Sequence, residues 1–219
     1  MEEFSRKKTV RNLRILYPLW VLVGIFSIMY VPSQLIDHDS AMTTAETISN
    51  NTTLYRLGIF GSLLTQLLFI IIPLLLFRLF EKVNRFQSIL MLLLALVSVP
   101  MTMYSESSKL MVLELLDQPE LMMLSLDSYY EVMTIAMIFW GLWLFPLGIL
   151  VYRSGYFPKI FGYFLIAAGF GYLLDAFTGI LMPTSSIVRS FLEILTFGEL
   201  LFILWLVIRG VKVNKEIRD

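Results

Sequence analysis

The stretch GSLLTQLLFIIIPLLLFR, residues 61–78, decides the class of fold, because its only ionisable residue is the final arginine. About 20 apolar residues in a helix cross a bilayer core that is about 30 Å thick. Five further runs of this character occur along the chain. The sequence therefore predicts an all-α integral membrane bundle, a single domain over residues 1–219. Its six transmembrane helices are expected at 15–33, 54–78, 87–105, 130–151, 159–182 and 188–209.

Composition supports this class and excludes several others. Hydrophobic residues make up 58% of the chain and charged residues 16%, whereas a typical soluble domain is about 25% charged. The absence of cysteine excludes disulfides, iron–sulfur clusters and thiolate chemistry, and one histidine, His38, excludes sites built from paired histidines. With a formal net charge of zero, nothing points to nucleic acid. We expect no metal and no cofactor.

The distribution of Lys and Arg predicts the orientation, because basic flanks stay in the cytoplasm. On one side of the predicted membrane lie only Arg56, Lys109 and Arg189. The other fourteen of the 17 basic residues flank the opposite ends of the spans. We therefore expect both termini to be cytoplasmic and the protein to be a multi-pass protein of the plasma membrane.

The predicted outer loops are acidic, and the sequence indicates the secondary structure of the first loop more clearly than that of the third. The first, residues 33–53, is polar and contains no Lys or Arg. The third, residues 105–127, has apolar residues at helical spacing. Either the third span continues beyond Tyr104, or residues 110–116 form an amphipathic helix in the membrane interface. Pro119 is typical of the first turn of a helix and is expected to begin the fourth one.

The heptapeptide GYLLDAF, residues 171–177, places the carboxylate of Asp175 inside an apolar run. An ionisable group at mid-helix costs about 2.5–3.5 kcal/mol, so it needs a partner or a purpose. Rise per residue predicts two polar layers. A deeper layer contains Gln66 and Glu199. The outer layer contains Arg56, Glu131, Asp175, Arg189 and Glu193.

The depths of these residues predict which side chains pair and which line a binding site. For each predicted pair, a purely structural role is the alternative. Asp175 is expected to be neutralised by Arg56, or otherwise by Arg189. The structural alternative is that such a pair does no more than hold the helices in register. Arg189 and Glu193, four residues apart, are predicted to form a structural ion pair. Glu199 is either protonated or hydrogen-bonded to Gln66. The candidate ligand-binding residues are Arg56, Gln66, Glu131, Asp175 and Glu199.

Small residues on the predicted fifth span indicate close helix packing. They are Gly162, Gly169 and Gly171, together with Ala167 and Ala168.

Three longer stretches resemble a known family. They are YRLGIFGSLL (55–64), YRSGYFPKIFGYFLIAAGFGYLLDAF (152–177) and FGELLFILWLVIRG (197–210). The chain resembles the uncharacterised bacterial membrane proteins grouped as domain of unknown function 4386. The resemblance implies six spans and a bacterial plasma membrane, but no activity. It places characteristic family residues at Arg56, Arg153, Gly155, Pro158, Asp175 and Glu199. The family pattern has a histidine in the fourth span, where this chain carries Trp143.

The sequence leaves three classes of function open. The first is a binding protein or carrier for a small molecule or ion, with a polar cluster open to the outside. The second is a non-transporting accessory, sensor, immunity or stress protein that acts through its outer loops, with a homo-oligomer or another membrane protein as partner. An enzyme acting on lipid ranks last, because no nucleophile–base pair is visible.

Overall fold

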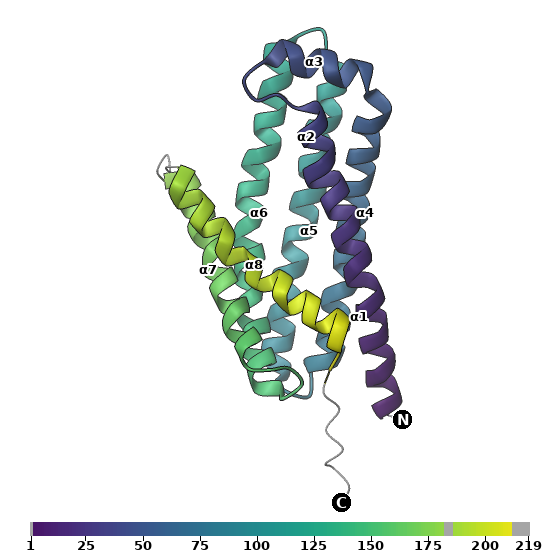
Figure 1. The fold of residues 1–219 in the computed structure, drawn as a ribbon, viewed down its shortest axis with the longest axis vertical. Helices are drawn as coiled ribbons and strands as arrows, with labels where there is room; N and C mark the ends of the chain where they lie inside the picture. The colour runs from purple at the N-terminus through teal and green to yellow at the C-terminus, as the bar shows by residue number, and fades with distance from the viewer. Residues whose placement is uncertain (1, 182–185, 212–219) are drawn as a thin grey trace, which may run out of the picture. The chain divides into compact units, whose positions relative to one another are not determined.

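The structure is a computed structural model that describes residues 2–181 and 186–211, with side chains except those of residues 2–5, 186–191 and 193. The residues that it describes contain helices and short connections and no strand, which confirms the all-α prediction (Figure 1). The elements are α1 (Glu2–Gly24), a π-helix η1 (Ile25–Tyr30), α2 (Val31–Leu35), α3 (Ala41–Asn50), α4 (Thr52–Phe80), α5 (Arg85–Glu114), α6 (Pro119–Ser154), α7 (Ile160–Leu181) and α8 (Ser186–Arg209).

Within the described residues, five helical segments are long and apolar enough to cross a membrane. They are Arg6–Leu35, Thr52–Phe80, Arg85–Glu114, Pro119–Ser154 and Ile160–Leu181. These segments correspond to the first five predicted spans, and the protein therefore has the helices of a membrane-embedded protein. The sixth prediction, 188–209, coincides with helix α8, but its role as a span stays a prediction, as does the orientation.

The third predicted outer loop is mostly helical. Helix α5 continues to Glu114, ten residues beyond Tyr104, and α6 begins at Pro119 as predicted. The first of the two alternatives for this segment is therefore correct. The separate amphipathic helix at 110–116 is wrong, because the helical hydrogen bonding of α5 continues without a break through Leu110.

The helices form two compact units. Unit 1 comprises Met1–Pro18, Ile70–Ser98 and Met137–Asp219, and unit 2 comprises Leu19–Phe69 and Val99–Ala136. Helices α1, α4, α5 and α6 each contribute one part to either unit, whereas α7 and α8 belong to unit 1 and α3 belongs to unit 2.

In unit 2, the first helical segment packs tightly on α4 through two glycines. A Cβ atom on Gly58 would lie 2.8 Å from Cγ1 of Val31, and one on Gly61 would lie 3.0 Å from Cβ of Ser27. Ser27 belongs to the π-helix η1 and is 1% exposed. The absence of side chains at 58 and 61 therefore lets α4 approach the π-helical turn.

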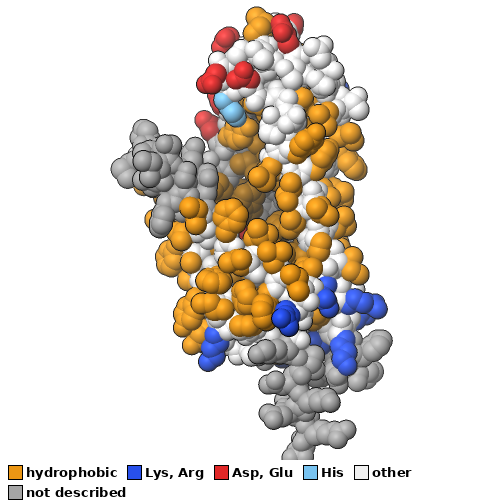
Figure 2. Space-filling view, in the orientation of Figure 1, with side chains coloured by type: hydrophobic (Ala, Val, Ile, Leu, Met, Phe, Trp, Pro, Cys, Tyr) orange, Lys and Arg blue, Asp and Glu red, His pale blue; other side chains and the backbone are white. Residues whose placement is uncertain are grey.

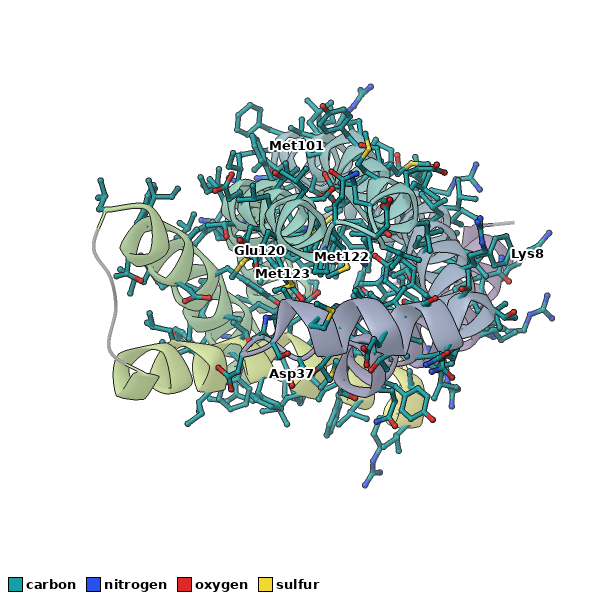
Figure 3. All side chains as sticks on the ribbon, turned by 90° about the horizontal axis from the view of Figure 1, so that it is seen from above. Lys8, Asp37, Met101, Glu120, Met122 and Met123 are labelled. Atoms are coloured by element: carbon teal, nitrogen blue, oxygen red, sulfur yellow. The ribbon has the colours of Figure 1, made fainter. Side chains whose placement is uncertain are left out.

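The first predicted outer loop contains an ordered helix, α3, that the sequence interpretation did not distinguish. Ser40 caps it by accepting a hydrogen bond from Thr43 N at 3.2 Å. Ala45 and Ile48 of α3 join a buried apolar cluster with residues of α2, α4, α5 and α6. Met122 of α6 belongs to the same cluster, and Met123 packs against it beside α3 (Figure 3). Helix α3 therefore closes one end of unit 2.

In unit 1, α7 packs closely on two neighbours. A Cβ atom on Gly162 would lie 2.7 Å from the carbonyl oxygen of Gly148 in α6, and one on Gly169 would lie 2.9 Å from that of Gly141. A Cβ atom on Gly171 would instead lie 2.9 Å from Cβ of Leu195 in α8. The prediction of close packing is confirmed, but the glycines lie on two faces of α7. Gly162 and Gly169 pack against α6, and Gly171 packs against α8.

Candidate functional site

The predicted ligand-binding residues belong to two different units. Arg56, Gln66 and Glu131 lie in unit 2, whereas Asp175 and Glu199 lie in unit 1. Arg56 and Glu131 are exposed, Asp175 is half-buried and Gln66 is 7% exposed. The predicted partners Arg56–Asp175 and Gln66–Glu199 are therefore divided between units, and both pairings stay predictions.

The predicted ion pair on α8 also stays a prediction. Arg189 and Glu193 lie on this helix, but their side chains are outside the described part of the structure. Asp175, on α7, has an interaction of its own in the structure and is not an isolated charge.

Glu199 of α8 is surrounded by tyrosines of unit 1. The hydroxyl of Tyr172, on α7, donates to Oε2 of Glu199 at 3.5 Å. Tyr17 of α1 is 1% exposed and interacts electrostatically with the same carboxyl. The ring of Trp140 contacts the edge of Tyr172 at a centroid distance of 6.2 Å. An aromatic, hydrogen-bonding environment therefore holds Glu199, and no ion pair with it occurs among the described side chains.

Unit 2 contains a buried ion pair that the sequence interpretation missed. Nζ of Lys109 lies 3.2 Å from Oε1 of Glu106, one turn earlier on α5. Both residues are 4% exposed. Transferring two charges from water to such a place costs several kcal/mol per ion, which their attraction offsets only with good geometry and further hydrogen bonds.

Two tyrosines hold Lys109 from neighbouring helices. Its ammonium lies 3.9 Å from the ring centroid of Tyr129 in α6, a distance at which the ring attracts a cation. The hydroxyl of Tyr55 in α4 donates to the backbone carbonyl of Lys109 at 3.2 Å. Ser125 of α6 donates to the carbonyl of Ser108 at 2.9 Å. Contacts from α4 and α6 therefore fix the segment of α5 that carries the ion pair.

Two buried oxygen atoms of this cluster lack a close hydrogen-bond partner among the described residues. They are Oε2 of Glu106 and Oγ of Ser62. The two groups face each other, and the hydroxyl of Ser62 lies close enough for a weak hydrogen bond to the Glu106 carboxyl. Buried polar atoms in folded proteins nearly always have a partner, either in the protein or in a bound water or ligand. We refer to Glu106, Lys109, Ser62, Tyr55 and Tyr129 as the Glu106 cluster.

The signal that could have found this cluster is spacing. Glu106 and Lys109 lie three residues apart, and apolar residues follow at helical intervals through Val112. The interpretation counted Lys109 as a loop cation because it ended the third span at Ser105. Side chains three residues apart on one helix face each other, but only the continuation of α5 brings this pair into the interior.

Within residues 2–181 and 186–211, no group of three or more His, Cys, Asp or Glu side chains could hold a metal ion. His38 is exposed, and its ring lies 5.8 Å from that of Tyr130. Asp37 lies at the beginning of the connection to α3 (Figure 3) and accepts a hydrogen bond from Asp39 N at 3.0 Å.

Comparisons with known proteins give a family but no activity. An uncharacterized protein of the archaeon Archaeoglobus fulgidus is 38% identical over 92 residues, which are 42% of this chain and 54% of that protein. The chain thus spans about half the length of this relative, and the bacterial origin that the resemblance implied stays a prediction. No solved structure matches. The model of the domain of unknown function DUF4386 matches residues 15–210. The chain therefore belongs to the DUF4386 family.

Proposed function

We propose that this protein binds a small polar molecule or ion within the membrane, at the Glu106 cluster, and acts as its binding protein or carrier. The observation that carries the proposal is the carboxyl of Glu106, which is buried and paired with Lys109 through one oxygen only. Ionisable residues inside a membrane are costly and commonly mark substrate or ion pathways.

The two unpartnered oxygens favour a ligand that donates hydrogen bonds or carries positive charge. Oε2 of Glu106 is an acceptor, and the hydroxyl of Ser62 can accept or donate. An ammonium group, an alkali-metal cation or a bound water meets this requirement. A purely structural ion pair would be stabilised further if both carboxylate oxygens were hydrogen-bonded.

The surroundings of the cluster include a π-helical turn, η1. Gly61, next to Ser62, packs against Ser27 in the π-helix η1. Single π-helical turns inside longer helices occur frequently at functional sites. Gln66 lies one turn further along α4 than Ser62, so it extends the polar face within unit 2. We retain Arg56 and Glu131 as proposed contributors within the same unit, whereas Asp175 and Glu199, in unit 1, stay separate candidate residues.

The test uses the purified full-length protein and a panel of sodium, potassium, ammonium, choline and free amino acids. Thermal unfolding is measured for the wild type and for Ser62→Ala, which removes one unpartnered oxygen, and for Glu106→Gln. Matched controls are Ser107→Ala and Glu114→Gln, whose side chains are exposed on α5. We expect one ligand to stabilise the wild type and both controls, and to lose this effect in Ser62→Ala and Glu106→Gln.

Two outcomes would overturn the proposal. In one, Ser62→Ala folds and responds to every ligand as the wild type does. In the other, no ligand of the panel stabilises any form of the protein. Uptake of the stabilising ligand into proteoliposomes then distinguishes a carrier, which accumulates or equilibrates it, from a binding protein.

A second candidate function rests on α3. This helix buries Thr44, Ala45 and Ile48 while Asp39 and Glu46 remain exposed. Figure 2 shows acidic side chains gathered at this end of unit 2. Such an ordered acidic surface fits a sensor or accessory protein that binds a basic partner. Co-purification of a partner that is lost in Asp39→Asn/Glu46→Gln would support this function, and unchanged co-purification would count against it.

A further inference from the structure

Unit 1 contains a pocket of about 430 Å³ between the beginning of α1 and the end of α8. It belongs to a different unit from the Glu106 cluster, which lies in unit 2. Basic side chains dominate the wall: Arg6, Lys7, Arg11, Arg14 and Arg209. The described residues that line the pocket include no carboxylate. Cations brought together around one cavity repel one another, so a bound anion would stabilise them.

One of these cations, Arg14, is held in place by hydrogen bonds. Nε of Arg14 donates to the carbonyl of Val207 at 2.8 Å, and Nη2 donates to that of Ile208 at 3.3 Å. These carbonyls belong to the last turn of α8, where such donors satisfy groups that the helix leaves without a partner. Gly210 then turns the chain with φ of +70°, and a Cβ atom at this position would lie 3.8 Å from Nη1 of Arg14 and 3.9 Å from Cγ1 of Val10. These contacts hold the end of α8 against α1, and the pocket lies between the two helices.

Aromatic rings position two further cations. The guanidinium of Arg6 lies 4.9 Å from the ring centroid of Tyr156, and that of Arg209 lies 5.9 Å from that of Trp205. Both distances are within the range of a cation–π interaction. Retention of basic flanks in the cytoplasm requires only enough charges, and it does not require that they line a cavity. The placement of these cations around one cavity is therefore more specific than the orientation of the protein in the membrane requires.

The remaining wall and its surroundings are apolar. Val10, Ile15 and Val211 line the pocket. Ile15 is 61% exposed and Ile208, in the last turn of α8, is 68% exposed. In a membrane protein such exposed apolar side chains face acyl chains. A ligand with a phosphate and attached hydrocarbon would match both parts of the wall, and basic pockets between transmembrane helices bind such headgroups.

We propose that this pocket binds the phosphate of an anionic phospholipid. The phosphate accepts hydrogen bonds from the guanidinium groups, which match its geometry. The acyl chains lie along Ile15 and the exposed apolar side of α8. Free inorganic phosphate has the same headgroup chemistry, and the experiment distinguishes the two sources.

The experiment uses delipidated full-length protein in a neutral detergent. Short-chain phosphatidylglycerol, phosphatidylcholine with the same chains, and inorganic phosphate are titrated separately, and lipid binding is measured by native mass spectrometry and thermal unfolding. The test variant is Arg11→Gln/Arg209→Gln, which leaves the Arg14 hydrogen bonds in place. The control, Arg78→Gln/Arg85→Gln, removes two exposed cations of unit 1 outside the pocket.

We expect phosphatidylglycerol to stabilise the wild type and the control, and to bind the test variant about tenfold more weakly. Phosphatidylcholine should stabilise all forms less. Equal loss in the test and control variants would overturn the proposal, because it would mean diffuse charge attraction. Equal binding of both lipids would overturn it as well. If inorganic phosphate reproduces the stabilisation and its loss in the test variant, the pocket binds a soluble anion and the lipid assignment is wrong.

Discussion

Glu106 in unit 2 and Glu199 in unit 1 are both carboxylates on apolar helices, but their surroundings differ in kind. Glu106 is paired with Lys109 at 3.2 Å and has one oxygen without a partner. Glu199 accepts a long hydrogen bond from Tyr172 beside buried Tyr17. The comparison teaches that depth in a helix does not predict how a carboxylate is accommodated. Neighbours from other helices decide this, and they also decide what a mutation costs.

The largest effect is expected for Lys109→Met. It leaves the carboxyl of Glu106 buried and without its cation, which we expect to cost about 3–5 kcal/mol in free energy of unfolding. Denaturant titration of the protein in detergent measures this loss. The double variant Glu106→Gln/Lys109→Met should recover most of it, because no unpaired charge remains. If Lys109→Met costs no more than Lys8→Met, at an exposed position of α1, the pair does not contribute as its geometry indicates.

A smaller effect is expected for Glu199→Gln. The amide oxygen of glutamine can still accept from the hydroxyl of Tyr172, and no buried cation loses its partner, so we expect a loss below about 1.5 kcal/mol. Tyr172→Phe should have an effect of similar size, because it removes a hydroxyl whose hydrogen bond to Glu199, at 3.5 Å, is at the limit for this interaction and which also interacts with the side chain of Thr196. If either variant loses as much free energy of unfolding as Lys109→Met in the same titration, the predicted difference between the surroundings of Glu106 and Glu199 is wrong.

Ser62→Ala is expected to change stability by no more than about 0.5 kcal/mol, in either direction. The hydroxyl has no close hydrogen-bond partner among the described residues and makes only a weak contact with the carboxyl of Glu106, so the loss of that contact and the removal of a poorly satisfied buried atom nearly offset each other. The same titration checks this value. A strong destabilisation would mean that Ser62 supports the structure of the Glu106 cluster and would weaken its use as a test of ligand binding.

The orientation of the two units in the membrane can be tested without changing stability. The chain contains no cysteine, so single cysteines can be labelled cleanly. Ser49→Cys at the end of α3 should react with a membrane-impermeant maleimide in intact cells, and Lys159→Cys before α7 should react only after permeabilisation. Both side chains are exposed. The reverse pattern would contradict the predicted cytoplasmic termini.

Much of the fold could be predicted because it depends on local composition. Apolar runs placed four of the spans within the helices observed and the fifth, 159–182, over α7, and Pro119 indicated the beginning of α6. The predicted spans were mostly shorter than the helices. Polar residues such as Glu106 ended the third span in the sequence interpretation, although helical hydrogen bonding continues to Glu114. Helix α3 was missed because its apolar positions, Ala45 and Ile48, are too few to form a distinct pattern.

The candidate site was predicted less well, for a related reason. Arg56, Gln66, Glu131, Asp175 and Glu199 were grouped by depth along their helices, which says nothing about which helices are neighbours. Unit membership separates the first three of these residues from the last two. Tyr17 and Tyr172 were not considered near Glu199, because 27 residues or more separate them from it in the chain. Contacts over such separations are properties of packing.

By itself, the sequence determined that this protein is an all-helical chain with long apolar helices and acidic and basic segments at different helix ends. Each of these properties follows from nearby residues and from the cost of exposing a backbone to hydrocarbon. Only the tertiary structure decided that Glu106 and Lys109 form a buried pair beside Tyr55 and Tyr129. It also decided that the cations of α1 line one pocket with the end of α8. Both arrangements depend on close approach of helices distant in sequence, which local composition does not specify.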